Sequence, residues 1–456
     1  MYPRILYVVV FGWLSWTGGR FTAPFLQKEV DFSETQVGVA LAIQNLLMSL
    51  MATPSGHLAD RWQRKRDHGR IHVLQLGMLL STCAFLGHWL PGRILPDMGF
   101  PYHLFLRVLY AIGIAMVMPV VDGITLAHFE ANGMDRSLYG RERLFGAVSW
   151  MVAHGLIGPI IDAYGFKLMY GSAILGGILS FLLIYKYTYD LDKHGIRLTV
   201  EKVMQEETSL LQQHEKSIEE YESINATMDP NDLTNDHPNA PTSSPTRSTS
   251  SSHKRGEFFW LTQIMCGTVF GMGFMISYFT LMMGVAVVEQ LIFIFFDSLG
   301  SSNTMCGLTV FVTVMFEIPL FHYAPFLLDT FGSGLLMYVA CFAYVTRVIG
   351  YTLIPDHQPY WVLLLEPLHG VTYACAKTSS VEFVAALVPT GHEAAGQGLL
   401  FLFRGLGSFC GVLLGGALED WYGSRVMYRA LAAIVGFGLT VYAAADRYHK
   451  RQSIKT

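Results

Sequence analysis

Two stretches far apart in the chain resemble each other and indicate how the chain is organised. Residues 158–170 read GPIIDAYGFKLMY and residues 416–428 read GALEDWYGSRVMY, an offset of 258 positions. The matching residues include an aspartate, glycines and tyrosines, which are not generic apolar filler. The matched pairs are Gly158 and Gly416, Asp162 and Asp420, Tyr164 and Tyr422, Gly165 and Gly423, Met169 and Met427, and Tyr170 and Tyr428. The sequence therefore predicts two related halves; chance similarity between apolar segments is the alternative.

A second repeated motif stands near the start of each half. Ser33-x-Thr35-x-x-Gly38 is echoed by Ser302-x-Thr304-x-x-Gly307. In both copies the Ser or Thr can cap the helix that follows, because its side-chain oxygen accepts from a free backbone N–H. We expect equivalent helices to begin at the two sites.

Apolar runs long enough to cross a membrane occupy most of the chain. The 456 residues are 52% hydrophobic and only 14% charged, with a mean hydropathy of +0.37. A helix needs about 20 residues to cross a ~30 Å hydrocarbon core, and its backbone must be satisfied within the segment. Twelve runs are predicted as such helices: 5–26, 35–58, 71–90, 103–127, 144–162, 167–187, 272–296, 305–328, 333–353, 360–388, 397–419 and 426–446.

One long polar stretch, 188–256, separates the two halves. It carries 19 of the 66 charged side chains and ends in a Ser-, Thr-, Pro- and Asn-rich run, which predicts a partly disordered linker. Lys and Arg gather in the loops at 60–70 and 129–143 and in the tail, so both termini and the linker are expected to be cytoplasmic. The expected domains are a six-helix bundle over 1–187, the linker over 188–256, a second six-helix bundle over 257–446 and a tail over 447–456. The sequence does not indicate which membrane holds the protein. It also leaves two readings of the uncharged segment 258–271: an interfacial piece or the start of the seventh helix.

Composition excludes several classes of protein. A net charge of −4 offers no basic field for nucleic acid, and so few charges argue against an average soluble enzyme or a disordered chain. The six cysteines show neither metal-binding nor disulfide spacing, so no metal or cofactor is expected.

Eleven charged side chains and one histidine fall inside the predicted spans. Exposing all eleven charges to lipid would cost ~30 kcal/mol, more than the ~5–15 kcal/mol that stabilises a folded protein. They are therefore expected to face one another or water inside the bundle, although Arg20, Arg107 and Glu382 could instead reach the interfaces. A purely structural polar network is the alternative. The set is Arg20, Arg107, Asp122, Arg143, Glu289, Glu317, Arg347, Glu366, His369, Lys377, Glu382 and Arg404.

The second predicted helix ends in Gly56-x3-Asp60-Arg61-x2-Arg64-Lys65. This pattern resembles the loop motif after the second helix of the major facilitator superfamily, in which the Asp and the basic residues latch the two halves together. The resemblance implies a latch role for these residues and that family's fold: an all-α membrane protein with twelve transmembrane helices in two pseudo-symmetric six-helix bundles. Gln63 stands where the family usually has Gly. A basic loop that only sets orientation is the alternative.

The region from Asp122 to Trp150, with Tyr139-Gly140-Arg141-x-Arg143 between them, resembles the fourth-to-fifth-helix region of the lactose-permease branch. That branch includes phenylpropionate-permease-like and major-facilitator-associated proteins. The resemblance implies that Asp122, Arg143 and Trp150 bind the substrate. A carboxylate and a guanidinium can grip hydroxyl groups through charge-assisted hydrogen bonds, and a Trp face can stack on a sugar or an aromatic ring. Asp122 is shorter than the Glu of that branch.

Three motifs of the second half also resemble that branch: Glu317-Ile-Pro319, Arg347-Val-Ile-Gly350 and Glu366-Pro-Leu-His369-Gly370. The resemblance implies proton-coupling roles for Glu317, Arg347 and His369. The branch carries its proton on an acid three residues after the His, but Thr372 stands there, so Glu366 or Glu317 is the expected substitute. Glu289 and Arg404 match an interhelical charge pair of the same branch.

The sequence thus favours a secondary active transporter, not an enzyme. The expected substrate is a small organic solute of the sugar, nucleoside or aromatic acid class, moved with protons by alternating access of two bundles. Expected partners are the lipid bilayer, the solute and protons, and not nucleic acid, while the oligomeric state is left open. A transporter-like receptor or scaffold signalling through 188–256 is one alternative. A membrane-embedded enzyme is another, but its single His box, His68-x3-His72, could not ligate a di-iron centre.

Overall fold

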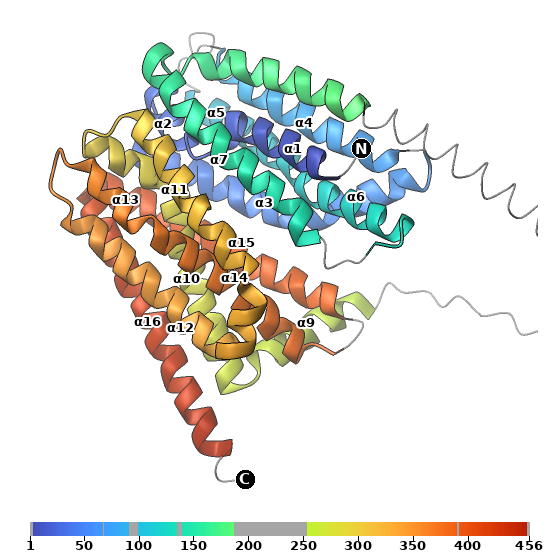
Figure 1. The fold of residues 1–456 in the computed structure, drawn as a ribbon, viewed down its shortest axis with the longest axis vertical. Coiled ribbons are helices and arrows are strands. Elements are labelled where there is room, and N and C mark those ends of the chain that lie inside the picture. Colours follow the sequence, from blue (N-terminus) through green and yellow to red (C-terminus); the bar gives the residue numbers. More distant parts are fainter. Residues whose placement is uncertain are drawn as a thin grey trace, which may run out of the picture. The chain divides into compact units, whose positions relative to one another are not determined.

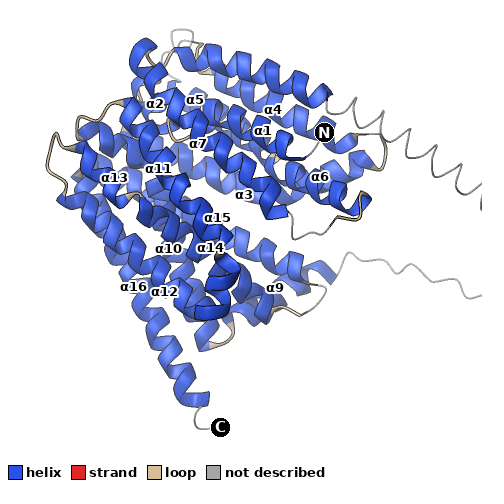
Figure 2. Ribbon diagram, in the orientation of Figure 1, coloured by secondary structure: helices blue, strands red, loops and turns tan. Residues whose placement is uncertain are grey.

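The described residues fold into α-helices joined by short connections (Figures 1 and 2). The structure is a computed structural model that describes residues 3–66, 68–90, 99–134, 139–186, 253–389 and 392–453. Within these ranges there is no β-strand, and ten helices are long and apolar enough to cross a membrane. The predicted all-α membrane class is confirmed.

Six helical segments make up the first half, in the order that the sequence predicts. The first and fourth are each divided by a short break, and the other four are continuous. Their bounds are α1 (Pro3–Gly18) with α2 (Thr22–Lys28), α3 (Glu34–Gln63), α4 (Gly69–Gly87), α5 (Gly99–Ala115) with α6 (Met118–Ala131), α7 (Tyr139–Tyr164) and the helix Leu168–Lys186.

Six helical segments also make up the second half, and the fourth of these is again divided. A 3₁₀ turn, η4 (Pro359–Trp361), precedes that divided segment. The bounds are α10 (Val269–Ser298), α11 (Asn303–His322), α12 (Ala324–Leu353), α13 (Val362–Leu365) with α14 (Pro367–Leu387), α15 (Glu393–Tyr422) and α16 (Ser424–Ser453).

The segment 258–271 divides between two helices. α9 (His253–Cys266) ends at Gly267, and α10 begins anew because the Thr268 side chain caps it by accepting from the Gly271 N–H. α9 has 14 residues and is not among the described helices that could cross a membrane. The predicted linker lies outside the described residues except for 253–256, which form the first turn of α9.

The two predicted N-terminal caps are present. Ser33 accepts from the Gln36 N–H at the start of α3, and Ser302 accepts from the Met305 N–H at the start of α11. These helices therefore begin at equivalent points of the repeat, as the paired motifs predict.

The two bundles contact each other through equivalent pairs of helices. α3 of the first bundle packs on α15 of the second, and α7 packs on α11. At the first crossing Gly38 meets Gly416, where a Cβ on Gly38 would lie 2.8 Å from the Gly416 Cα. At the second, Gly158 lies against the backbone of Asn303, and Gly307 lies against the backbone of His154. The glycines of the repeat thus let the backbones of the two bundles touch.

Candidate functional site

An aspartate and an arginine face each other in the first bundle. Arg143 Nη1 of α7 lies 3.5 Å from Asp122 Oδ2 of α6, and the two side chains are 46% and 27% exposed. Tyr7 of α1 donates to Asp122 Oδ1 at 2.8 Å, and Arg143 donates to the Tyr139 hydroxyl at 2.8 Å. The pair is held by hydroxyl groups yet partly open, so a solute could reach both charges.

Trp150 lies two turns along α7 from Arg143 and is half-buried. Its ring lies edge-on to Phe11 at 6.5 Å and 4.3 Å from the ring of His154, measured between centroids. His154 is fully buried, with Nδ1 at 2.9 Å from the Trp150 carbonyl oxygen and Nε2 accepting from the Arg20 N–H at 3.1 Å. The sequence analysis did not single out His154, although its spacing of four residues from Trp150 places both on one helix face.

The second bundle buries an ion pair. Arg347 of α12 and Glu366, which stands at the break before α14, are 1% and 0% exposed and meet at 2.9 Å. The other Glu366 oxygen accepts from the Tyr351 hydroxyl at 2.7 Å, and Thr313 donates to the same oxygen as Arg347 at 2.6 Å. Both carboxylate oxygens are therefore satisfied, as a buried charge requires.

His369 connects this pair to the first bundle. Its Nδ1 lies 2.5 Å from Arg347 Nη1, and its Nε2 lies 3.3 Å from Nη2 of Arg20. A neutral imidazole has one acceptor nitrogen, so it accepts from only one guanidinium at a time. Arg20 stands in the break between α1 and α2, and it reaches across to the other bundle rather than to an interface.

Four more charged residues lie around this centre. Glu317 of α11 interacts electrostatically with Glu289 of α10 and with Arg20 and Arg404, and no described donor lies within hydrogen-bonding distance of its carboxylate. Arg404 of α15 lies over the Tyr373 ring at 5.8 Å, and Lys377 interacts electrostatically with Arg404 and, across the bundles, with Arg143 and Asp122. We call the whole set the central charge network: Arg20, Asp122, Arg143, Glu289, Glu317, Arg347, Glu366, Lys377 and Arg404.

The structure also places the predicted Glu289–Arg404 pair and the predicted intramembrane Arg107. Glu289 and Arg404 interact electrostatically, but they are not within ion-pair distance in the described part of the chain. Arg107 is fully buried inside the first bundle, where it donates to Gln44 and lies over the Tyr110 ring at 4.4 Å, without a carboxylate. Arg107 therefore does not reach an interface.

The predicted latch residues lie at the end of α3. Asp60 accepts from Arg70 of the same bundle at 2.8 and 3.0 Å. Arg61, Arg64 and Lys65 are exposed, and nothing lies within 4 Å of a Cβ built on Gly56. In this arrangement Asp60 is held by its own bundle, and the latch stays a prediction.

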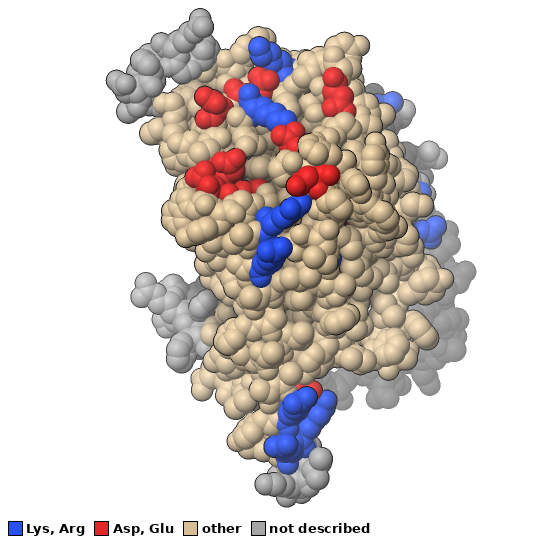
Figure 3. Space-filling view, turned by 90° about the vertical axis from the view of Figure 1, so that its left-hand side faces the viewer, with Lys and Arg blue, Asp and Glu red and all other residues tan. Residues whose placement is uncertain are grey.

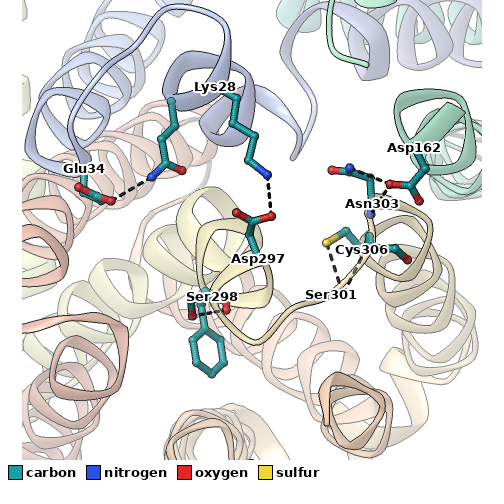
Figure 4. Close-up of polar contacts among 11 residues, drawn as sticks. Lys28, Glu34, Asp162, Asp297, Ser298, Ser301, Asn303 and Cys306 are labelled. Carbon is teal, nitrogen blue, oxygen red and sulfur yellow. Dashed lines mark hydrogen bonds and ion pairs between the residues drawn. The ribbon is translucent and has the colours of Figure 1, made fainter. Parts of the chain in front are cut away.

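A third set of polar contacts joins the bundles where α7 ends and α11 begins, which we call the sealed end (Figure 4). The Asp162 carboxylate accepts four hydrogen bonds of 2.6–2.9 Å, two each from Asn303 and Thr304. Its repeat partner Asp420 accepts from Thr35 at 2.5 Å. Lys28 pairs with Asp297 at 2.6 Å beside them. The residues that the repeat matches thus bond across the bundles, each Asp to the helix start of the opposite half.

The comparisons with known proteins agree with this architecture. A family model described as the MFS_1 like family matches residues 4–430. The solved nucleoside transporter NupG has a TM-score of 0.71 and 14% identity, with 97% of this chain and 98% of that chain covered. A POT family transporter in complex with 5-aminolevulinic acid has a TM-score of 0.64 and 11% identity, with coverages of 97% and 95%.

A third solved structure, a bacterial homolog of the human lysosomal transporter Spinster, has a TM-score of 0.56 and 15% identity, with coverages of 98% and 95%. The family and these structures are transporters rather than enzymes, and at such identities the structures support the fold alone. Because the family model spans almost the whole chain, the protein belongs to the MFS_1 like family, with the major facilitator fold.

Proposed function

We propose that the chain is a proton-coupled secondary transporter of a small organic solute, working by alternating access. The observation that carries the proposal is the contact of Arg20 with His369, which ties the first bundle to the buried Arg347–Glu366 pair of the second. A solute or proton that alters the charges around His369 therefore alters a contact between the two bundles. Such a coupling of a central site to bundle position is what alternating access requires.

In this proposal the solute binds at Asp122, Arg143 and Trp150. The ion pair is long, at 3.5 Å, and partly exposed, so hydroxyl or carboxylate groups of a solute can insert between the two charges. The Trp150 face offers a stacking surface for a sugar or an aromatic ring. Sugars, nucleosides and aromatic acids all combine these features.

Between the two expected proton carriers, the contacts favour Glu317. Glu366 accepts from Arg347, Tyr351 and Thr313, so protonating it would break an ion pair in a fully buried site. Glu317 has no described hydrogen-bond donor, so it can gain or lose a proton without breaking a bond. We assign Glu366 to holding Arg347 and His369 in place.

The first test is a thermal-shift screen of purified protein with sugars, nucleosides and aromatic acids, repeated on Arg143→Ala. A ligand that stabilises the wild type and not the variant supports the site. The Asp122–Arg143 pair is partly exposed, so breaking it should cost no more than about 1 kcal/mol of stability. The Tm of Arg143→Ala without ligand should therefore lie close to the Tm of the wild type. A ligand that stabilises both proteins equally contradicts the assignment.

The second test measures solute-driven proton uptake in liposomes. Glu317→Gln should abolish coupling, while the control Glu382→Gln, which alters an acid of α14 outside the central charge network, should retain it. Undiminished coupling in Glu317→Gln removes this residue from the role. Ligand binding without any flux in the wild type would instead support a receptor.

A further inference from the structure

A lysine in the middle of α14 faces the centre of the molecule without a partner of opposite charge. Lys377 is the eleventh of the 21 residues of α14, and it is exposed. Among the described residues, nothing forms a hydrogen bond or an ion pair with its ammonium group. Its electrostatic interactions are with Arg404, Arg143 and Asp122, so two of these three neighbours repel it.

The position of Lys377 within a membrane span indicates a function. A charge exposed to lipid in the middle of a span is strongly destabilising, and charged residues kept there mark ligand or ion pathways. Because Lys377 interacts with residues of both bundles, it faces the space between them and not lipid. An exposed ammonium group in that space can contact a solute.

Tyr373 brings two guanidinium groups close to the same turn of α14. It precedes Lys377 by four residues, so both side chains lie on one face of the helix. The Arg404 guanidinium lies 5.8 Å from the centre of the Tyr373 ring, and Arg143 of the other bundle interacts electrostatically with Tyr373. Three cations from two bundles therefore lie around this turn.

The carboxylates near these cations do not balance them. Four cations and three carboxylates interact here, which leaves one positive charge when all are ionised. Asp122 pairs with Arg143 at 3.5 Å, whereas Lys377 has no such pair in the described ranges. A group with one negative charge would balance the set. The cations are Arg20, Arg143, Lys377 and Arg404, and the carboxylates are Asp122, Glu289 and Glu317.

The sealed end is charged differently. Figure 3 looks onto it and shows acidic side chains gathered beside basic ones. Lys28 pairs there with Asp297 at 2.6 Å, one cation with one anion. Arg143 precedes Asp162 by 19 residues of α7, about 28 Å at 1.5 Å per residue. The uncompensated positive charge therefore lies far from the sealed end.

The two repelling cations belong to different bundles. The repulsion between Arg143 of α7 and Lys377 of α14 opposes any closer approach of these helices. An anion between the two cations removes that repulsion and accepts charge-assisted hydrogen bonds from both of them. It therefore favours the arrangement in which the two helices come together around it.

We propose that the transported solute is a small organic anion with one negative charge, and that this charge is held between Arg143 of the first bundle and Lys377 of the second. The inference rests on the proposed transport function and narrows its solute class. Lys377 selects an anion over a neutral solute, while Trp150 keeps the role of stacking on the rest of the molecule. Without the anion the two cations keep α7 and α14 apart, so closure depends on loading.

The first test compares anions with neutral molecules of similar shape in a thermal-shift titration of the full chain in detergent at neutral pH. The pairs are glucuronate and glucose, orotate and uracil, and benzoate and benzamide. At least one anion should raise Tm where its neutral partner does not, and sodium chloride of the same ionic strength should not reproduce the shift. Lys377→Gln should raise the anion concentration for a half-maximal shift at least about tenfold, the loss expected for a charge-assisted hydrogen bond.

Two control variants keep the shift specific to the charge at this position. Lys377→Arg retains the charge and should keep the shift. Lys186→Gln removes one exposed positive charge outside the central charge network and should keep it too. If Lys377→Gln does not fold, Lys377→Met, which is also unbranched and uncharged, decides.

The outcomes separate this inference from the transport proposal. Equal shifts with an anion and its neutral partner, or an undiminished shift in Lys377→Gln, overturn the inference. A neutral molecule that binds through Arg143 and is taken up by liposomes overturns it while leaving the transport proposal standing. An anion that binds through Lys377 without any flux supports the anion site and contradicts transport.

The second test needs no solute. Cys306 at the sealed end is 3% exposed, and in a variant whose other five cysteines are Ala its maleimide labelling reports the opening of that end. Lys377→Gln removes the repulsion, so the bundles should close around the centre and labelling should speed up about two- to fivefold. Lys377→Arg should label like the wild type. An unchanged rate in Lys377→Gln overturns the inference, including when none of the six probes shifts Tm.

Discussion

Replacing Asp162 by Ala should open the sealed end. The carboxylate accepts from the backbone N–H groups of Asn303 and Thr304, from the Asn303 amide and from the Thr304 hydroxyl. It therefore acts as an N-terminal cap on α11 that is supplied by the opposite bundle. Losing it removes four hydrogen bonds between the bundles and leaves only Ser302 to cap the start of α11.

The size of the effect follows from the kind of contact. An N-cap side chain contributes about 0.5–2 kcal/mol, and a negative charge at a helix N-terminus adds about 0.3–1 kcal/mol when exposed. The sum of about 1–3 kcal/mol corresponds to a roughly 5- to 150-fold increase in the open population. Asp420→Ala removes one hydrogen bond, from the Thr35 hydroxyl, whereas Asp162→Ala removes four, so Asp420→Ala should increase the open population less.

Cys306 provides the assay. It lies in the first turn of α11 beside the seal, 3% exposed, with Sγ 4.0 Å from the Ser301 hydroxyl (Figure 4). In a variant whose other five cysteines are Ala, its rate of maleimide labelling reports opening. Asp162→Ala should speed labelling more than Asp420→Ala, with Asp162→Asn between the wild type and Asp162→Ala. Equal rates in wild type and Asp162→Ala would refute the reasoning.

Three further predictions concern stability and the crossing of the bundles. Glu366→Gln should lower stability by about 3–5 kcal/mol because it leaves the buried Arg347 guanidinium without its counter-charge. The control Lys450→Gln breaks a pair whose Lys is 70% exposed and should cost about 1 kcal/mol or less. Equal Tm values for the two variants would contradict this prediction. Gly416→Val should speed Cys306 labelling because a Cβ at position 416 would lie 2.6 Å from the Gly38 Cα and push the two helices apart. The control Gly436→Ala should leave the labelling rate unchanged, because a Cβ there meets nothing within 4 Å. An unchanged rate in both variants would count against the close crossing. Ser33→Ala and Ser302→Ala should each lose about 1 kcal/mol in denaturant unfolding, and an unaltered midpoint would show that these caps do not matter.

The repeat and the apolar runs were enough to predict the two bundles and their helix order. The caps at Ser33 and Ser302 follow from the same motifs, because capping is a local interaction between residues three apart. The break at Gly267 and Thr268 was not predictable, since an uncharged apolar segment carries no mark of where one helix ends and the next begins.

The contacts between the bundles needed coordinates. The sequence pairs Asp162 with Asp420 as equivalent positions, but their bonds run to Thr304 and Thr35 of the opposite halves. Equivalence within a repeat does not say which surfaces meet. The sequence also left open whether Arg20 lies inside the bundle or at an interface. In the structure Arg20 contacts His369 of the other bundle. The assignment of substrate, proton and latch residues stays a prediction.

The central charge network also constrains the electrical character of transport. With all four carboxylates ionised, it contains five cations (Arg20, Arg143, Arg347, Lys377, Arg404) and four anions (Asp122, Glu289, Glu317, Glu366), a sum of +1. A monoanionic solute would neutralise that sum, and its co-movement with one proton would carry no net charge across the bilayer. A neutral solute moving with a proton would carry one charge and gain about 2.3 kcal/mol per 100 mV. The voltage dependence of uptake therefore distinguishes an aromatic acid from a sugar before either is identified.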